Sequence, residues 1–325
     1  MSTPTSTVDP GPPGPGTRAT LIYNPTSGTR NVAALLPAAL DVLRGSGWQV
    51  DVQTTQRPGD LYRLAAQARD QQQTVVLVAG GDGSLNEAAN ALAFSKTALG
   101  MLPSGTANVW GRQIGLPLPS PLVANHLIDA AQANAGGTVR TIDLGRAGTR
   151  YFVLWSGVGL DAQVTAQIEP RPPWVKRFGV VGYAWRAFWI AVRYRGTRMD
   201  IQIDERRIRG RALMVLVSNA QLYGGVLRAA PDARLDDGWL DVTIMKGGSF
   251  RELARHAWHY LRQRTEADTG VFRQRARHIR VRARRPCYVH VDAEPIGRTP
   301  VDIDVAARAL RVIVPAGAPR ELFAG

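Results

Sequence analysis

The sequence contains one cysteine in 325 residues, Cys287. A single thiol excludes an intramolecular disulfide and a zinc site built from several cysteines, and it fits the reducing cytoplasm. Long apolar runs are also missing. The longest candidate, residues 178–192, contains Arg186, whereas a spanning helix needs roughly 18 unbroken apolar residues. Residues 1–18 lack an apolar segment, so we expect a disordered tail there rather than a secretory signal.

Two common phosphate-binding motifs are absent as well. The sequence has no G-x-x-x-x-G-K-[ST] motif, which excludes a P-loop enzyme. It has no G-x-G-x-x-G after its first expected strand, so dinucleotide redox chemistry loses its main support.

Acidic residues are outnumbered by basic ones, with 26 Asp and Glu against 40 Lys and Arg and a formal net charge of +14. Such a chain is attracted to nucleic acid, anionic lipid headgroups or nucleotides, and the sign of the charge does not choose among them. Because no nucleic-acid reading module is recognisable, we expect no nucleic-acid partner.

The order of apolar segments predicts two domains. Up to about Gly136, β-branched strands alternate with helical segments, which predicts an α/β domain with a parallel sheet and helices on both faces. Beyond it, successive strand-like segments such as Tyr151–Ser156 predict a mainly antiparallel second domain. We therefore expect a tail over 1–18, an α/β domain over 19–136 that 315–325 could rejoin, and a second domain over 137–314.

Three glycine-bearing turns follow successive strands of the first domain, and they are Asn24–Gly28, Gly80–Ser84 and Pro103–Asn108. Parallel strands deliver such turns to one edge of a sheet, where ligands bind. Glycines allow close backbone approach, and amides at a helix start hold anionic oxygens. The alternative reading is structural: Ser84 and Glu87 fit a capping box that only starts a helix, and the other turns are ordinary turn sequences. Three such turns in a row favour phosphate binding.

At these residues the chain resembles the diacylglycerol kinase catalytic family, and more closely its bacterial soluble lipid kinases. The shared sequences are NPTSG from Asn24, GGDGSLNE from Gly80, PSGTAN from Pro103 and IDLG from Ile142. They continue with GVGLDA from Gly157, Asn219 with Tyr223-Gly224-Gly225, DGWLD from Asp237, and Asp292-Ala293-Glu294.

The resemblance implies an ATP-binding α/β domain, a C-terminal β-sandwich that binds the lipid, and ATP in a cleft between them. Carried over by position, the residues that bind ATP are Asn24, Pro25, Thr26, Ser27, Gly28, Thr55, Gly80, Gly81, Asp82, Gly83, Ser84, Leu85, Asn86 and Thr106.

The resemblance also assigns the metal ligands and the base. Mg²⁺ is expected at the Asp237 carboxylate and at the backbone oxygens of Arg234 and Trp239, and the general base is expected to be Glu294. Asp82 and Asp143 are expected to orient the Mg²⁺ of the nucleotide through water, because Mg²⁺ dehydrates reluctantly.

Three residues depart from the family pattern. Ser84 stands where Thr is usual, Ala293 replaces the glycine of Asp-Gly-Glu, and Val109 replaces an acidic residue of the metal network. These departures keep open a catalytically impaired nucleotide- or lipid-binding protein. NAD kinase, which shares the GGDG turn, is the other alternative, against which the following Asn86-Glu87 and NPTSG argue.

Two further patterns have two readings each. As a strand, residues 278–284 place Arg280, Arg282 and Arg284 on one face, which either contacts lipid phosphate or an anionic surface, or is simply solvated. The basic, aromatic segment 174–193 either lies in a membrane interface or covers a sheet. His256 and His259 lack a third ligand, so we interpret them as ordinary histidines rather than a metal site.

The sequence therefore predicts a Mg²⁺-dependent ATP:lipid phosphotransferase, cytoplasmic and peripherally attached to an anionic membrane surface. The lipid acceptor is diacylglycerol-like or sphingoid. The oligomeric state is left open, a homodimer included.

Overall fold

The computed structural model describes residues 12–25, 32–120, 125–168, 182, 185–225, 227–262 and 268–324. The predicted ATP-binding residues Thr26, Ser27 and Gly28 lie outside these described ranges. The chain forms two compact units, Met1–Asp143 with Arg308–Gly325, and Leu144–Ala307. Within the described ranges, no helix is long and apolar enough to cross a bilayer.

The boundaries between the units lie inside two long strands, β5 (Thr138–Ala147) and β17 (Val301–Val314). Each strand begins in one unit and ends in the other. The change in the sequence pattern near Gly136 coincides with the start of β5. The boundary between the two units lies seven residues later, at Asp143, inside the strand. No glycine- or proline-rich linker marks this position in the sequence.

The first unit is an α/β domain with a parallel sheet, as the sequence predicts. Its other strands are β1 (Arg18–Tyr23), β2 (Gln49–Thr54), β3 (Val75–Gly80) and β4 (Ala98–Pro103). Its helices are α1 (Val32–Gly45), α2 (Asp60–Asp70), α3 (Asp82–Leu92), α4 (Val109–Gln113) and α5 (His126–Ala135), with a short 3₁₀ helix at Arg320–Leu322.

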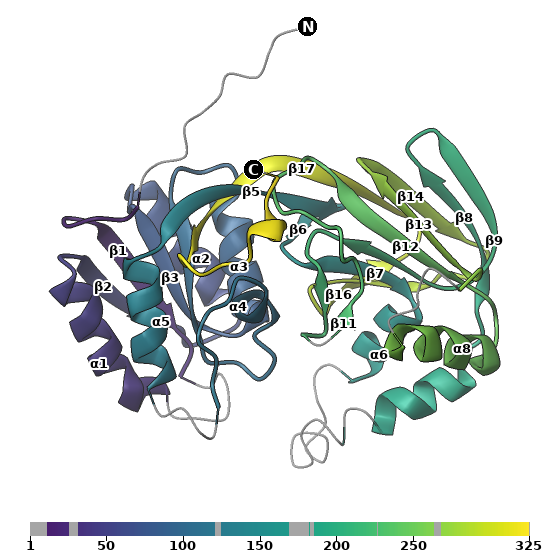
Figure 1. The fold of residues 1–325 in the computed structure, drawn as a ribbon, viewed down its shortest axis with the longest axis horizontal. Helices are drawn as coiled ribbons and strands as arrows, with labels where there is room; N and C mark the ends of the chain where they lie inside the picture. Colours follow the sequence, from purple (N-terminus) through teal and green to yellow (C-terminus); the bar gives the residue numbers. More distant parts are fainter. Residues whose placement is uncertain are drawn as a thin grey trace, which may run out of the picture. The chain divides into compact units, whose positions relative to one another are not determined.

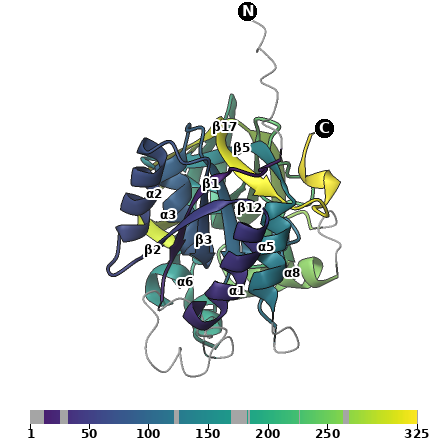
Figure 2. The ribbon, with the colours of Figure 1, turned by 90° about the vertical axis from the view of Figure 1, so that its left-hand side faces the viewer.

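The sheet order β2-β1-β3-β4-β17 has parallel pairing throughout. Figure 2 shows α1 and α5 on one side of this sheet and α2 and α3 on the other. Strand β3 is buried along its whole length because helices cover both faces. The order reverses between β1 and β3, and in open α/β sheets such a switch point is where ligands bind.

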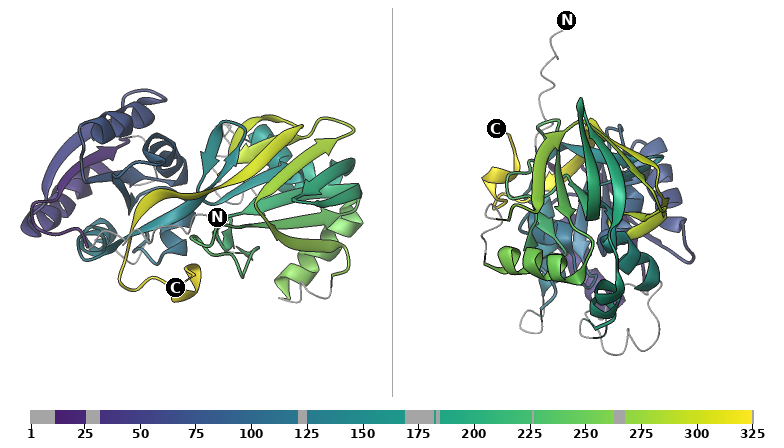
Figure 3. Two further views of the ribbon diagram at one scale, coloured as in Figure 1. Left: turned by 90° about the horizontal axis from the view of Figure 1, so that it is seen from above. Right: turned by 90° about the vertical axis from the view of Figure 1, so that its right-hand side faces the viewer.

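The second unit is built from mainly antiparallel strands, as the sequence predicts (Figures 1 and 3). Its strands are β6 (Arg150–Phe152), β7 (Trp155–Gly159), β8 (Thr197–Ile203), β9 (Arg206–Ser218), β10 (Leu222–Tyr223), β11 (Leu227–Arg228), β12 (Leu240–Lys246), β13 (Val271–Ala276), β14 (His278–Ala283), β15 (Tyr288–Val291) and β16 (Glu294–Arg298). Its helices are α6 (Leu160–Ile168), residues 185–193 and α8 (Phe250–Leu261).

The core of this β-sandwich collects the inward residues of alternate strand positions, such as Ile201 of β8, Val215 of β9 and Ile279 of β14. The single strand expected at Tyr151–Ser156 is wrong in one respect. It is broken into β6 and β7 at Val153 and Leu154, because the amides there donate to a side chain instead of a neighbouring strand.

Candidate functional site

The strand ends of the first unit converge at one edge of its sheet. The Asn24 amide donates to the Ala79 carbonyl (3.5 Å), and the Ser104 amide donates to the Gly80 carbonyl (3.0 Å). The Thr55 amide donates to the Tyr23 carbonyl (3.0 Å). Hydrogen bonds between successive turns hold the predicted ATP-binding turns together, as far as they are described.

Two of these turns touch through their glycines. A Cβ built on Gly105 would lie 2.5 Å from Cα of Gly81, and one built on Gly80 would lie 2.7 Å from Cβ of Ser84. Asn108, in the left-handed conformation (φ 46°), fixes the third turn by accepting from the Gly105 amide (2.9 Å) and donating to its carbonyl (2.8 Å). Only glycine permits backbones to approach this closely.

The start of α3 differs from the capping box considered above. The helix begins at Asp82 with Gly81 as its N-cap, so Ser84 lies inside the first turn. No side chain caps this end of the helix. The first amides of a helix have no partner within it, and the helix dipole favours an anion there. This end of α3 is therefore suited to hold a phosphate group.

Replacing Gly105 by alanine tests this contact. The added methyl group must displace the backbone of Gly81, so we expect Gly105→Ala to cost about 1–3 kcal/mol of stability and to weaken nucleotide binding. Gly45→Ala is the matched control, because Gly45 lies in α1 outside the predicted ATP-binding residues, a Cβ there meets nothing within 4 Å, and alanine favours a helix. Thermal unfolding and nucleotide titration of both variants provide the measurement. Equal behaviour of the two would contradict the role given to the glycine contact.

Asp82 faces the start of α4. Its carboxylate accepts the amide of Trp110 (3.0 Å) and is half-buried. Burial raises the pKa of the Asp82 carboxyl, and the amides of Trp110 and Val109 offset part of that rise. Val109 is buried. Because it is a valine, the position where the family pattern has an acidic residue supplies no carboxylate here. Asp82 thus ties the second turn to the third and keeps one side open to solvent.

Asp143 is completely buried, and its carboxylate accepts the amide of Arg308 (2.7 Å). Arg308 has a left-handed backbone (φ 52°). Asp143 therefore supports the point where β17 enters the first unit, and its expected role toward the nucleotide metal stays a prediction.

The turn between β11 and β12 carries the expected metal ligands Arg234, Asp237 and Trp239. The Asp237 carboxylate forms an ion pair with Arg275 and accepts the amide of Trp239 (3.1 Å). In the described part of the chain, no group of three or more His, Cys, Asp or Glu side chains is placed to hold a metal ion. As folded here, the turn does not fit a resident Mg²⁺, since Arg275 already neutralises its carboxylate.

The Asp292-Ala293-Glu294 sequence forms the tip of the β15–β16 hairpin. Asp292 (φ 43°) and Ala293 (φ 65°) both adopt the left-handed conformation of a tight two-residue turn. The buried Asp292 carboxylate accepts the amides of Val153 (2.8 Å), Leu154 (3.0 Å) and Trp155 (2.9 Å). The hairpin tip is thereby fixed to the junction of β6 and β7.

Glu294, the expected base, follows this turn with half of its side chain exposed. Its carboxylate forms an ion pair with Arg150 at 2.5 Å. The arginine restrains the carboxylate without burying it, so a proton acceptor at Glu294 remains open to a ligand from solvent.

Behind the turn lies a partly buried network of His290, Asp161 and Tyr223 to which the sequence analysis assigned no role. The Ala293 amide donates to Nδ1 of His290 (3.3 Å), so the other ring nitrogen, Nε2, donates to the Asp161 carboxylate. The Tyr223 hydroxyl donates to the same carboxylate. Burial alone raises the pKa of Asp161, but His290 and Tyr223 bring it below its usual value. A Cβ at Gly157 would lie 2.3 Å from both the Asp161 and the His290 side chain, which explains a glycine there.

Ala293 offers a simple test of the turn. A left-handed backbone costs a non-glycine residue about 1–2 kcal/mol, and glycine avoids this while losing about 0.5–1 kcal/mol of chain entropy on folding. We expect Ala293→Gly to leave the free energy of unfolding unchanged or to raise it by about 1 kcal/mol. Denaturant unfolding provides the measurement, and a clear loss of stability would contradict the turn geometry.

Known proteins resemble the chain over both units. Residues 18–147 match the diacylglycerol kinase catalytic domain, and residues 156–314 match the YegS C-terminal NAD kinase beta sandwich-like domain. A diacylglycerol kinase of Bacillus subtilis is 28% identical over 300 residues, which cover 92% of this chain and 96% of the relative. One of Staphylococcus saprophyticus is 28% identical over 285 residues, covering 87% and 90%. The crystal structure of a diacylglycerol kinase from Bacillus anthracis superposes with a TM-score of 0.71 at 20% identity, covering 93% of this chain and 98% of that one, which shows the fold.

Proposed function

We propose that the chain, which belongs to the diacylglycerol kinase catalytic family and matches the YegS C-terminal domain over residues 156–314, transfers the γ-phosphate of ATP to the hydroxyl group of a lipid. As a member of this family, the protein is a phosphotransferase with an alcohol acceptor. ATP as the donor, a diacylglycerol-like or sphingoid acceptor and a part in phospholipid biosynthesis are the finer elements of the proposal.

One observation carries the proposal most strongly, the glycine contact between the second and third turns beside the uncapped start of α3. Phosphoryl transfer depends mainly on positioning and on neutralising charge around the γ-phosphate. Backbone amides at this edge of the sheet supply fixed partial positive charges, and the exposed residues Gly83 and Thr106 leave the edge accessible. We also propose contacts to the nucleotide from Asn24, Thr55, Ser84 and Asn86.

In the proposed reaction the lipid hydroxyl oxygen attacks the γ-phosphorus, and the bond to the bridging oxygen breaks, releasing ADP. Glu294 accepts the hydroxyl proton, an effect worth about 10²–10⁴-fold in rate. The Asp292 bonds and the His290–Asp161–Tyr223 network hold the backbone on which Glu294 stands. These groups position the base and are not themselves expected to touch substrate.

Mg²⁺ belongs to the proposal as the counter-ion that arrives with ATP. Asp82 is the only one of the two expected carboxylates, Asp82 and Asp143, with access to solvent. When bound, the ion would neutralise phosphate charge. Asp82 would meet the ion through water, because Mg²⁺ takes oxygen ligands and dehydrates reluctantly, while the amides of the neighbouring turns would hold phosphate oxygens.

We also propose peripheral attachment to an anionic membrane surface and a cytoplasmic location. Helix 185–193 exposes Trp185 (60%), Phe188 (47%) and Trp189 (40%), and α8 exposes Trp258 (54%). Phe188 packs edge-on against Phe250 of α8 with ring centroids 5.8 Å apart, so the two helices present these aromatics beside each other. Arg193 and Arg262 lie over Trp189 and Trp258, a combination suited to a lipid interface.

NAD kinase is the second candidate, because the matched C-terminal domain is described as NAD kinase beta sandwich-like. Radiolabelled ATP offered with NAD in one reaction and with mixed lipids in another separates the two. We expect label only in the lipid fraction. Label in NAD, or ATP binding with transfer to neither acceptor, would contradict the proposal.

A further inference from the structure

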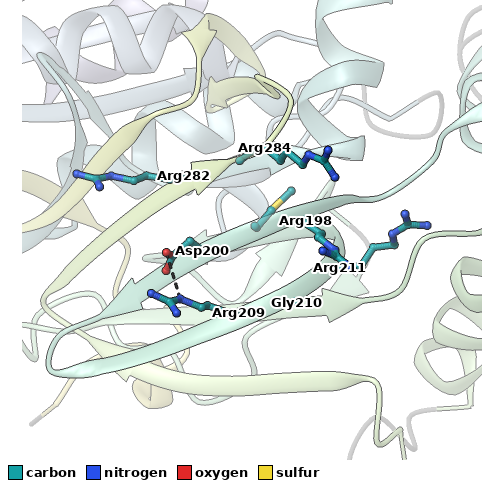
Figure 4. A pocket seen from close by; sticks show the side chains of 9 residues that line it. Arg198, Asp200, Arg209, Gly210, Arg211, Arg282 and Arg284 are labelled. Atoms are coloured by element: carbon teal, nitrogen blue, oxygen red, sulfur yellow. Dashed lines mark ion pairs between the residues drawn. The ribbon is translucent and has the colours of Figure 1, made fainter.

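The solvent face of the second unit carries a pocket lined by arginines. It has a volume of about 870 Å³ and lies over the neighbouring strands β9, β8 and β14 (Figure 4). Its charged lining residues are Arg198, Asp200, Arg209, Arg211, Arg282 and Arg284. None of these residues belongs to the site described above.

Strand register explains why the arginines gather there. Arg198 of β8 pairs with Arg211 of β9, and the Arg284 amide donates to the Arg198 carbonyl (2.9 Å). The alternate residues, such as Met199 and Val281, point into the core of the sandwich. Three guanidinium groups therefore stand in one row across three adjacent strands, which spans roughly 10 Å at the usual strand spacing.

The charges on this sheet face are compensated at one end and not at the other. Asp200 pairs with Arg207 and Arg209, and Asp302 pairs with Arg280. By contrast, within the described residues the side chains of Arg198, Arg211, Arg282 and Arg284 form no ion pair. Like charges on adjacent strands destabilise a sheet, so the row has a cost to the free protein that a bound anion would remove.

A second pocket of about 450 Å³ shares Arg198, Arg211 and Arg284 and adds Arg195 and Arg285. The cationic surface therefore continues from the first pocket into the second one. A single carboxylate would neutralise only one of these charges. Phosphate groups offer several oxygens each and accept bidentate hydrogen bonds from arginine.

From this geometry we propose that the pocket is a binding site for a ligand that carries two or more phosphate groups, separate from the nucleotide site. The ligand is either a free polyphosphorylated molecule or a set of phosphorylated lipid headgroups, and both share the chemistry that the arginine row recognises. The row Arg211–Arg198–Arg284 bridges neighbouring phosphates, and Arg282 contributes from the next position along β14.

The test compares the full-length double variant Arg198→Ala/Arg284→Ala with the control Arg44→Ala/Arg320→Ala. The control removes the same charge from exposed helical positions, Arg44 of α1 and Arg320 of the 3₁₀ helix, which lie outside both the pocket and the proposed membrane surface. Sodium tripolyphosphate is titrated into each protein by calorimetry. In parallel, sedimentation is measured with phosphatidylcholine vesicles that contain or lack phosphatidic acid. Wild type and both variants keep the phosphate-binding turns of the first unit, which also offer a site for tripolyphosphate. Only a loss of binding that occurs in the pocket variant and not in the control is therefore assigned to the pocket.

We expect the pocket variant to bind tripolyphosphate about 100-fold more weakly than wild type, about tenfold for each arginine. Its thermal stability should be unchanged or higher, which separates lost binding from lost folding. Loss in the calorimetric arm alone identifies a free ligand, and loss in both arms identifies lipid headgroups. If the pocket variant keeps wild-type binding in both arms, or loses no more than the control, the site does not exist.

Discussion

Replacing Glu294 by glutamine is expected to lower the turnover of lipid phosphorylation by about 10²–10⁴-fold, the usual contribution of a general base. Glutamine keeps the size of the side chain and removes its ability to take a proton. Because the side chain of Glu294 is half-exposed and bonded to one surface arginine, the fold should be unaffected. Initial rates with saturating ATP and lipid, together with a thermal unfolding curve, provide the measurement.

Arg150→Ala is the matched control for this variant. It breaks the same ion pair from the other side and leaves the carboxylate in place. We expect its rate to stay within a few-fold of wild type, because an exposed ion pair contributes about 0–1 kcal/mol. If Glu294→Gln and Arg150→Ala were equally active, Glu294 would lose its role as the base.

Replacing Asp292 by alanine is expected to lower the free energy of unfolding by about 3–5 kcal/mol. The carboxylate accepts three amides, those of Val153, Leu154 and Trp155, at a site that is 7% exposed. Each buried amide left without an acceptor costs about 1–3 kcal/mol, and the losses are partly shared. Chemical denaturation of the variant should show this loss, and activity should fall with it because the support of the hairpin tip is gone.

Asp292→Asn separates hydrogen bonding from side-chain volume. Asparagine keeps one acceptor oxygen for Leu154 and Trp155 and tolerates the left-handed backbone, but its amide group meets the Val153 amide. We expect a loss clearly smaller than that of Asp292→Ala. Equal stability of wild type and both variants would show that these three hydrogen bonds contribute nothing.

The alternation of strands and helices was enough to predict the first unit because parallel sheets bury whole strands, and β3 reads as an unbroken apolar run. The second unit was predicted less completely. Helix α6 and strand β13 were not predicted, since Leu160–Ile168 has weak amphipathic character and Val271–Ala276 has the polar run Arg-Gln-Arg at its centre. The break between β6 and β7 depends on Asp292, which lies more than a hundred residues further along the chain.

The glycine-bearing turns could be found from sequence because glycine and asparagine signal unusual backbone conformations, as at Asn108. The hydrogen-bond and ion-pair partners of the acidic residues could not be found from the sequence. Nothing near Asp237 in the sequence indicates that Arg275 on β13 neutralises it, and nothing near Asp143 indicates the Arg308 amide. Asp161 and Tyr223 lay in sequences shared with the family and His290 did not, and only the fold brings the three residues together.

The most direct test of the proposed function is an untargeted one. The protein is incubated with ATP, Mg²⁺ and a total lipid extract, and the lipids are compared by mass spectrometry with those from a reaction containing Glu294→Gln. We predict that a lipid alcohol gains one phosphate group with the wild-type protein and not with the variant. A wild-type protein that binds ATP but leaves every lipid unphosphorylated would contradict the assignment as a lipid kinase.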